Sequence, residues 1–208
     1  MSDQGVDIPQ QFFSRQDESD DAQFYAVPRL VQHIDDATIA ALTDFYRTQL
    51  KPDARLLDLM SSWVSHLPEE MSFADVQGLG MNAEELTQNP RLDAWTVQNL
   101  NQHPQLPYAD ASFDHAMIVV SIQYLTRPVD VMREIYRVLR PGGDLCIAMS
   151  HRCFPTKAIA AFTQLGIEDR LKLVGYYLEQ GGFSDVRLVD RSPANADPLW
   201  LMLGDKRH

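Results

Sequence analysis

The chain has 208 residues and a formal net charge of −11, from 29 acidic and 18 basic residues. Its length, with 45% apolar and 23% charged residues, is typical of one globular domain. The sequence has no apolar run long enough to cross a membrane, and its N-terminus lacks the basic and apolar regions of a secretory signal. The acidic charge argues against nucleic acid as a partner, so neither nucleic acid nor a membrane is expected.

The cysteines and histidines exclude two further classes of protein. Two cysteines, Cys146 and Cys153, are too few for a disulfide framework, which favours reduced thiols and a cytoplasmic location. The six histidines are scattered, without HxH or HExxH spacing, so no metal site is expected.

The first quarter of the chain has the weakest periodicity. Residues through Asp21 are polar and acidic, and we expect them to be loosely ordered. A short helical piece is expected over residues 28–32. Asp35 or Asp36 is expected to cap a longer helix that ends near Leu50.

From residue 54 onwards, strand and helix patterns alternate. Apolar runs predict strands at residues 55–59, 71–79, 95–100, 113–120, 144–149, 185–190 and 199–203. Apolar residues at helical spacing predict helices at residues 83–88, 128–139, 156–164 and 167–180. Gly181-Gly182 is expected to close the last helix, and Pro141-Gly142-Gly143 predicts a turn.

This order of elements predicts an α/β fold. Strands that alternate with helices form a mostly parallel sheet with helices on both faces. No helical pattern separates the last two strands, so they are expected to pair as a hairpin, with the last strand antiparallel. We therefore expect a single domain over residues 1–208, a three-layer sandwich around a seven-stranded, mostly parallel sheet.

Three segments carry a resemblance to a known family. They are LLDL at residues 56–59, LPYADASFDHAMIV at 106–119 and REIYRVLRPGGDLCIAMS at 133–150. Together they resemble class I S-adenosylmethionine-dependent methyltransferases, whose Rossmann-like domain has the expected architecture. The resemblance implies S-adenosylmethionine as the cofactor and transfer of its methyl group to a small-molecule or protein acceptor.

The loop after the first strand departs from this family. Asp58 matches the acid that ends the strand, whereas Met60, Ser62 and Val64 stand where the family has glycines. A side chain at such a position hinders positive φ and close approach of a ligand, so a weakened cofactor loop is expected. The residues that the resemblance implies for this part of the cofactor site are Asp58, Leu59, Met60, Ser61 and Ser62.

The ribose position is altered as well. The family's ribose-binding acid, roughly 20 residues beyond the loop, maps to Gly80, which has no side chain to make that contact. Met81 and Asn82 follow Gly80. Asn82 could bond to the ribose, or it could cap the next helix, with Glu85 three residues later completing a capping box.

The remaining cofactor positions follow the third and fourth strands. The family's adenine-binding acid maps to Asn99, beside Leu100, and an amide oxygen can still accept a hydrogen bond from the adenine amino group. Ser121, after the fourth strand, completes the expected cofactor contacts.

Candidate catalytic residues follow the strands, because ligands of open α/β sheets bind at the carboxyl ends of the strands. His66, Tyr124 and His151 follow the first, fourth and fifth strands, and each is a candidate base for an acceptor that must lose a proton. Packing, helix capping or simple exposure would equally account for the two histidines.

Two functions remain open at this point. One is a methyltransferase with an atypical loop. The other is a non-catalytic relative that acts as a binding or interaction module, with cofactor binding weakened or lost, which the combined loss of glycines and ribose acid motivates. In either case an N-terminal helical segment, residues 1–53, is expected to cap the site of the core, residues 54–208, with Tyr25, Arg29 and His33 reaching over it.

Overall fold

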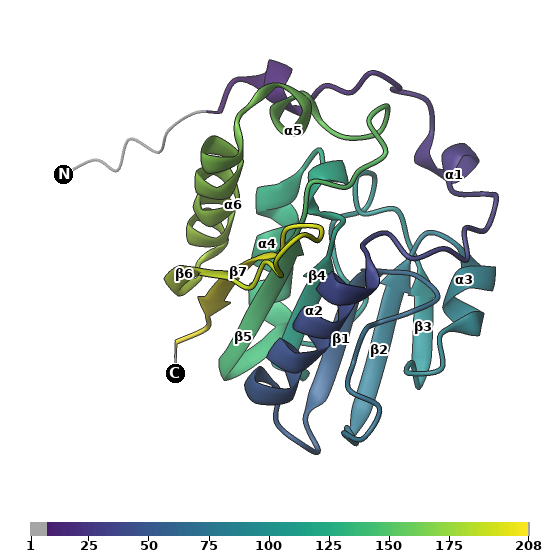
Figure 1. Cartoon of the computed structure of the whole chain (residues 1–208), viewed down its shortest axis with the longest axis vertical. Helices are drawn as coiled ribbons and strands as arrows, with labels where there is room; N and C mark the ends of the chain where they lie inside the picture. Colours follow the sequence, from purple (N-terminus) through teal and green to yellow (C-terminus); the bar gives the residue numbers. More distant parts are fainter. Residues whose placement is uncertain (1–7, 208) are drawn as a thin grey trace.

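The computed structural model describes residues 8–207, and within them seven strands form one sheet (Figure 1). The strands are β1 (Arg55–Ser61), β2 (Asp75–Gly80), β3 (Ala94–Val97), β4 (Phe113–Val119), β5 (Leu139–Met149), β6 (Ser184–Asp190) and β7 (Trp200–Asp205). Their order is β3-β2-β1-β4-β5-β7-β6, and β7 runs antiparallel to both of its neighbours. The Rossmann-like fold class that the sequence predicts, with an antiparallel last strand, is confirmed.

The helices cover both faces of this sheet. They are α1 (Asp21–Phe24), α2 (Asp36–Gln49), α3 (Ala83–Gln88), α4 (Pro128–Val138), α5 (Ala160–Gln164) and α6 (Ile167–Gly181), with 3₁₀ turns η1 (Gln10–Phe13) and η2 (Ile122–Tyr124). In β1, Leu57 and Leu59 belong to the cluster of α4 and α6, whereas Leu56 belongs to the cluster of α2. This alternation follows from the opposite directions of successive side chains in a strand.

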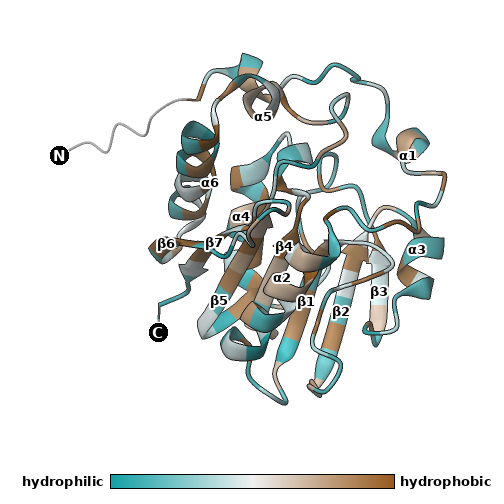
Figure 2. Ribbon diagram, in the orientation of Figure 1, coloured by the Kyte–Doolittle hydropathy of each residue, from teal (hydrophilic) through white to brown (hydrophobic). Residues whose placement is uncertain are grey.

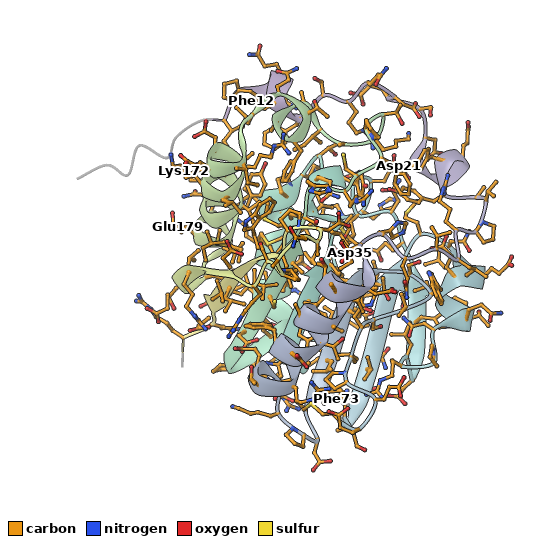
Figure 3. The ribbon with its side chains drawn as sticks, in the orientation of Figure 1. Phe12, Asp21, Asp35, Phe73, Lys172 and Glu179 are labelled. Carbon is orange, nitrogen blue, oxygen red and sulfur yellow. The ribbon has the colours of Figure 1, made fainter. Side chains whose placement is uncertain are left out.

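The outer helix faces are polar. Figure 2 shows hydrophobic strands in the middle of the molecule, and Figure 3 shows Lys172 and Glu179 on the outer side of α6. As the sequence predicts, Asp35 caps α2, because its carboxylate accepts the Thr38 N–H at 2.9 Å, and Gly182 closes α6 in the left-handed conformation.

The N-terminal region differs from the prediction. Residues 28–32 form no helix; the short helix is α1, whose N-terminus is capped by the Asp20 carboxylate. The expected loose order is also wrong for residues 8–21, because Asp21 is buried against two cations, the nearby Arg15 and the distant Lys157. The rest of that prediction concerns residues 1–7, which lie outside the described part of the chain.

The predicted turn at Pro141-Gly142-Gly143 lies inside β5. Phe113 of β4 pairs with Leu139, and two residues later His115 pairs with Asp144, so the three residues are accommodated as an irregularity of the strand. Three other elements are clearly shorter than predicted: β2 begins at Asp75 instead of residue 71, β3 ends at Val97 instead of residue 100, and α5 begins at Ala160 instead of residue 156. The turn-forming residues therefore make a bulge instead of ending the strand, because the strand continues at Asp144, which pairs with both β4 and β7.

Candidate functional site

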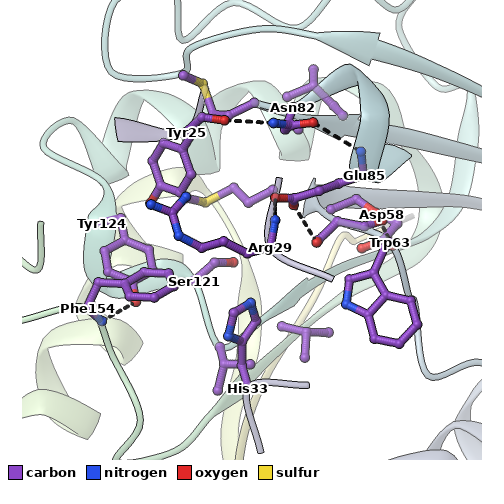
Figure 4. Close-up of a pocket in the computed structure, with 18 of the residues that line it drawn as sticks. Tyr25, Arg29, His33, Asp58, Trp63, Asn82, Glu85, Ser121, Tyr124 and Phe154 are labelled. Carbon is purple, nitrogen blue, oxygen red and sulfur yellow. Dashed lines mark hydrogen bonds between the residues drawn. The ribbon is translucent and has the colours of Figure 1, made fainter. Parts of the chain in front are cut away.

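A cavity of about 310 Å³ opens at the carboxyl ends of β1, β2 and β4 (Figure 4). This volume lies at the lower end of the range for small-molecule sites. Ten of the eleven residues predicted to contact the cofactor line the cavity, namely Asp58, Met60, Ser61, Ser62, Gly80, Met81, Asn82, Asn99, Leu100 and Ser121. Leu59 does not, because its side chain is fully buried in the core on the side of α4 and α6.

Asp58 provides a buried carboxylate at the end of β1. Its Oδ2 accepts hydrogen bonds from the hydroxyls of Ser61 and Ser65, each at 2.6 Å, and Asn89 donates to the Ser65 hydroxyl at 2.8 Å. Burial raises the pKa of Asp58 to about 6, and the two hydroxyls limit this rise. The carboxylate is therefore mostly ionised at neutral pH and places a negative charge at the cavity wall.

Met60 keeps a glycine-like backbone where the family has its first loop glycine. Its φ is 58°, in the left-handed region, and it forms a bulge between Leu59, paired with Leu79, and Ser61, paired with Gly80. A non-glycine residue in this conformation costs roughly 1–2 kcal/mol. Met60 therefore adopts the backbone conformation that favours glycine, at the position where the resemblance expects the first loop glycine.

The absence of an acid at Gly80 follows from this bulge. A Cβ on Gly80 would lie 2.3 Å from the carbonyl oxygen of Ser61, far closer than atoms can approach. That oxygen belongs to the main chain, so no change of rotamer relieves the clash. The path of the loop at Ser61 thus excludes a side chain at Gly80, the position to which the resemblance maps the ribose-binding acid.

Asn82 and Glu85 tie this part of the site to the N-terminal segment. Asn82 caps α3 by accepting the Glu85 N–H at 3.1 Å, and its amide donates to the Tyr25 carbonyl at 2.8 Å. Glu85 accepts the Arg29 backbone N–H at 2.7 Å and the Ser62 hydroxyl at 2.6 Å. The sequence predicts Glu85 only as a capping residue. Its place in the first turn of α3, directly after β2, is the signal that its carboxylate can reach the cavity.

Residues 17–33, here called the covering segment, lie over the cavity. Those that line it are Asp21, Tyr25, Arg29, Val31, Gln32 and His33. Lys157, fully buried, anchors the segment with its ammonium 3.2 Å from an Asp17 carboxylate oxygen and 3.3 Å from an Asp21 oxygen. Trp63 adds a hydrogen bond from its indole N–H to the Val31 carbonyl.

The predicted catalytic candidates separate into two groups. His66 and Tyr124 line the cavity, whereas His151 does not, and its Nε2 lies 3.0 Å from Oδ1 of Asp197. Burial lowers the pKa of His66 to about 4 and also lowers the pKa of His33. Both imidazoles are therefore uncharged at neutral pH.

Two hydroxyl groups of the cavity, those of Tyr124 and Ser121, differ in whether they have a hydrogen-bond partner. The Tyr124 hydroxyl accepts the Phe154 N–H at 2.7 Å, and burial raises the pKa of Tyr124 to about 12. The Ser121 hydroxyl is buried and has no hydrogen-bond partner among residues 8–207. A buried hydroxyl without a partner is costly, which makes Ser121 a candidate ligand contact.

Over the described residues, no group of three or more His, Cys, Asp and Glu side chains is arranged to hold a metal. Within the same range, no helix has the length and apolar character needed to cross a membrane.

Comparisons with known proteins agree with this geometry. A sequence-family model described as "Methyltransferase domain" matches residues 63–147. Methyltransferase GfsG of Streptomyces halstedii is 54% identical over 43 residues, which are 21% of this chain and 16% of that protein. The resemblance to methyltransferases is confirmed. The matched segment is, however, a small part of that relative's own length.

Solved structures extend the likeness to the whole fold. The [4+2]-cyclase SpnF superposes with a TM-score of 0.60 at 18% identity, over 80% of each chain. Phosphoethanolamine N-methyltransferase 2 of Haemonchus contortus, in complex with phosphomonomethylethanolamine and S-adenosylhomocysteine, gives a TM-score of 0.59 at 14% identity, over 81% of this chain and 52% of that one. At these identities the likeness shows the fold.

Proposed function

We propose that this chain is an S-adenosylmethionine-dependent methyltransferase acting on a small-molecule or protein acceptor in the cytoplasm. The observation that carries the proposal is the cavity at the carboxyl ends of β1, β2 and β4, with Asp58 buried beneath the left-handed turn at Met60. The methyltransferase-domain match over residues 63–147 supports it, as does the S-adenosylhomocysteine bound by the Haemonchus enzyme, whose fold is similar.

The residues of the cavity fit the cofactor with one substitution. Asp58 and the unpartnered hydroxyl of Ser121 would hold its methionine end, and Asn99 its adenine. Gly80 cannot bear the ribose acid, but Glu85 brings a carboxylate to the same wall from α3. Its oxygens accept one hydrogen bond each from Arg29 and Ser62, so lone pairs remain for ribose hydroxyls.

The chain's own residues then position the acceptor and exclude water. When bound, S-adenosylmethionine supplies a methyl group on a sulfonium, which is already a good leaving group, so alignment is the main requirement. The uncharged imidazoles of His33 and His66 can accept a proton from an acceptor that must lose one. Tyr124 is unsuited to this role because its pKa is raised to about 12.

Calorimetric titration with S-adenosylmethionine and S-adenosylhomocysteine tests the proposal. We expect saturable heat with both, and a Glu85→Gln variant that binds ten- to a hundredfold more weakly, as expected when one charged hydrogen bond is lost. Glu84→Gln is the matched control, because Glu84 is exposed one position away on α3. Absence of heat and of thermal stabilisation at millimolar ligand would overturn the proposal.

A non-catalytic binding module is the second candidate. It is favoured by one observation, that the polar groups of Asp58, Asn82 and Glu85 already bond to groups of the chain itself. The second function predicts that Asp58→Ala leaves function in the cell intact. A cell that loses function with a stable Asp58→Ala protein would exclude it.

A further inference from the structure

Arg29 carries an unpaired charge inside the cavity. Its guanidinium donates to two backbone carbonyls of its own segment, those of Phe24 at 2.9 Å and Val27 at 3.2 Å. A guanidinium has five N–H donors, so most of its hydrogen-bonding capacity is unused. No carboxylate of residues 8–207 lies within 4.0 Å of it, although the chain holds 29 acidic residues.

The acids that line the same cavity are engaged elsewhere. Asp21 pairs with Arg15 and Lys157, and the Asp58 carboxylate accepts two serine hydroxyls. Glu85 accepts the backbone N–H of Arg29 rather than its guanidinium. Every acid that lines this cavity therefore has a partner, and Arg152, the other arginine of the lining, pairs with Asp197. Arg29 has no carboxylate partner among residues 8–207.

Aromatic rings hold the guanidinium in this position. Its central carbon lies 4.4 Å from the ring centre of Phe24, 5.3 Å from that of Phe154 and 5.9 Å from that of Tyr25. Figure 4 shows the side chain of Arg29 extending across the cavity towards Tyr25. These cation–π contacts restrict the position of the guanidinium, and its unused N–H groups remain available to an oxygen acid.

We propose that Arg29 binds a carboxylate of the ligand that occupies this cavity. A planar guanidinium matches a carboxylate with two parallel hydrogen bonds, and the partly buried setting strengthens them. This inference rests on the proposed methyltransferase function, which defines the ligands that could supply the carboxylate. The source is either the methionine part of the cofactor or the methyl acceptor, and the chemistry recognised by Arg29 is the same.

The first arm of the test compares S-adenosylhomocysteine with 5′-methylthioadenosine, which lacks the carboxylate. The variants are Arg29→Gln, Arg29→Lys and the control Arg91→Gln, since Arg91 is similarly stacked on Phe73 and bonded to a backbone carbonyl but does not line the cavity. If the cofactor is the source, Arg29→Gln weakens S-adenosylhomocysteine at least tenfold and leaves methylthioadenosine unchanged.

The second arm compares benzoate with benzamide by saturation-transfer NMR. If the acceptor is the source, wild-type protein binds benzoate in preference to benzamide, Arg29→Gln abolishes this preference, and S-adenosylhomocysteine affinity is unchanged. The proposal is overturned if Arg29→Gln binds both S-adenosylhomocysteine and benzoate as tightly as wild type does. It is also overturned if Arg29→Gln loses affinity equally for the charged and the neutral ligands.

Two outcomes keep the inference separate from folding and from the proposed function. If Arg29→Gln lowers the unfolding temperature, two other measurements decide: the affinity of Arg29→Lys for the carboxylate ligands, and the preference of the wild type for benzoate over benzamide. Lysine keeps the charge but lacks the planar guanidinium, so it should bind a carboxylate more weakly than arginine does. Should the wild-type protein not bind S-adenosylhomocysteine, the proposed function fails, and the benzoate arm alone supports or overturns the role of Arg29.

Discussion

Replacing Gly80 by alanine tests the close contact between β2 and the loop after β1. The added Cβ would lie 2.3 Å from the Ser61 carbonyl oxygen and 3.2 Å from Cδ2 of Leu86. The oxygen must retreat by about 1 Å to reach an ordinary contact, which moves the Ser61 hydroxyl away from Asp58. Overpacking typically costs about 1–3 kcal/mol, and because main chain must move here we expect the upper end, about 3 kcal/mol.

Urea unfolding of Gly80→Ala and Gly175→Ala provides the measurement and its control. Gly175 lies within α6, its added Cβ would be no closer than 3.8 Å to any neighbour, and alanine should stabilise the helix by about 0.5–1 kcal/mol. A loss below about 1 kcal/mol for Gly80→Ala would refute the steric reasoning. Gly80→Asp should likewise fail to strengthen binding of S-adenosylhomocysteine, although it restores the family's acid.

Three further predictions concern the same wall and its cover. Burial raises the pKa of Asp58 from 3.8 to about 6, so the stability that Asp58 contributes below pH 4 is lost as the pH rises through 6. Asp58→Asn should therefore gain roughly 2 kcal/mol on wild type between pH 4 and pH 7 in urea titrations, and a difference that does not change with pH would contradict this. Lys157→Met leaves Asp17 and Asp21 without their shared cation, so amide hydrogen exchange in the covering segment, residues 17–33, should accelerate at least tenfold. Unchanged exchange would show that Lys157 does not anchor this segment. Met60→Gly should be about 1 kcal/mol more stable than Met60→Ala, since only glycine relieves the left-handed backbone, and the reverse order would contradict its φ of 58°.

The sheet and most helices could be predicted because their signals are local. Strand alternation, the Asp35 cap and the closing glycines of α6 depend on residues adjacent in the chain, and the structure has each of them. The position of the cavity could also be predicted, because parallel strands bring their carboxyl ends to one edge.

What could not be predicted depends on contacts between distant residues. The acidic run through Asp21 resembles a solvated tail, yet Asp17 and Asp21 pair with Lys157, which lies more than a hundred residues away in sequence. The clash at Gly80 depends on the path of Ser61, and the use of Glu85 depends on the backbone of Arg29. Contacts between residues far apart in the chain produce no recognisable spacing pattern in the sequence.

A crystal structure of the chain with S-adenosylhomocysteine tests most directly whether this altered wall still binds the cofactor. We expect the ligand across the carboxyl ends of β1 and β2, with its ribose hydroxyls on the Glu85 carboxylate and its methionine end between Asp58 and Ser121. A cavity that stays empty at millimolar ligand, or a ligand bound elsewhere on the molecule, would contradict the central claim.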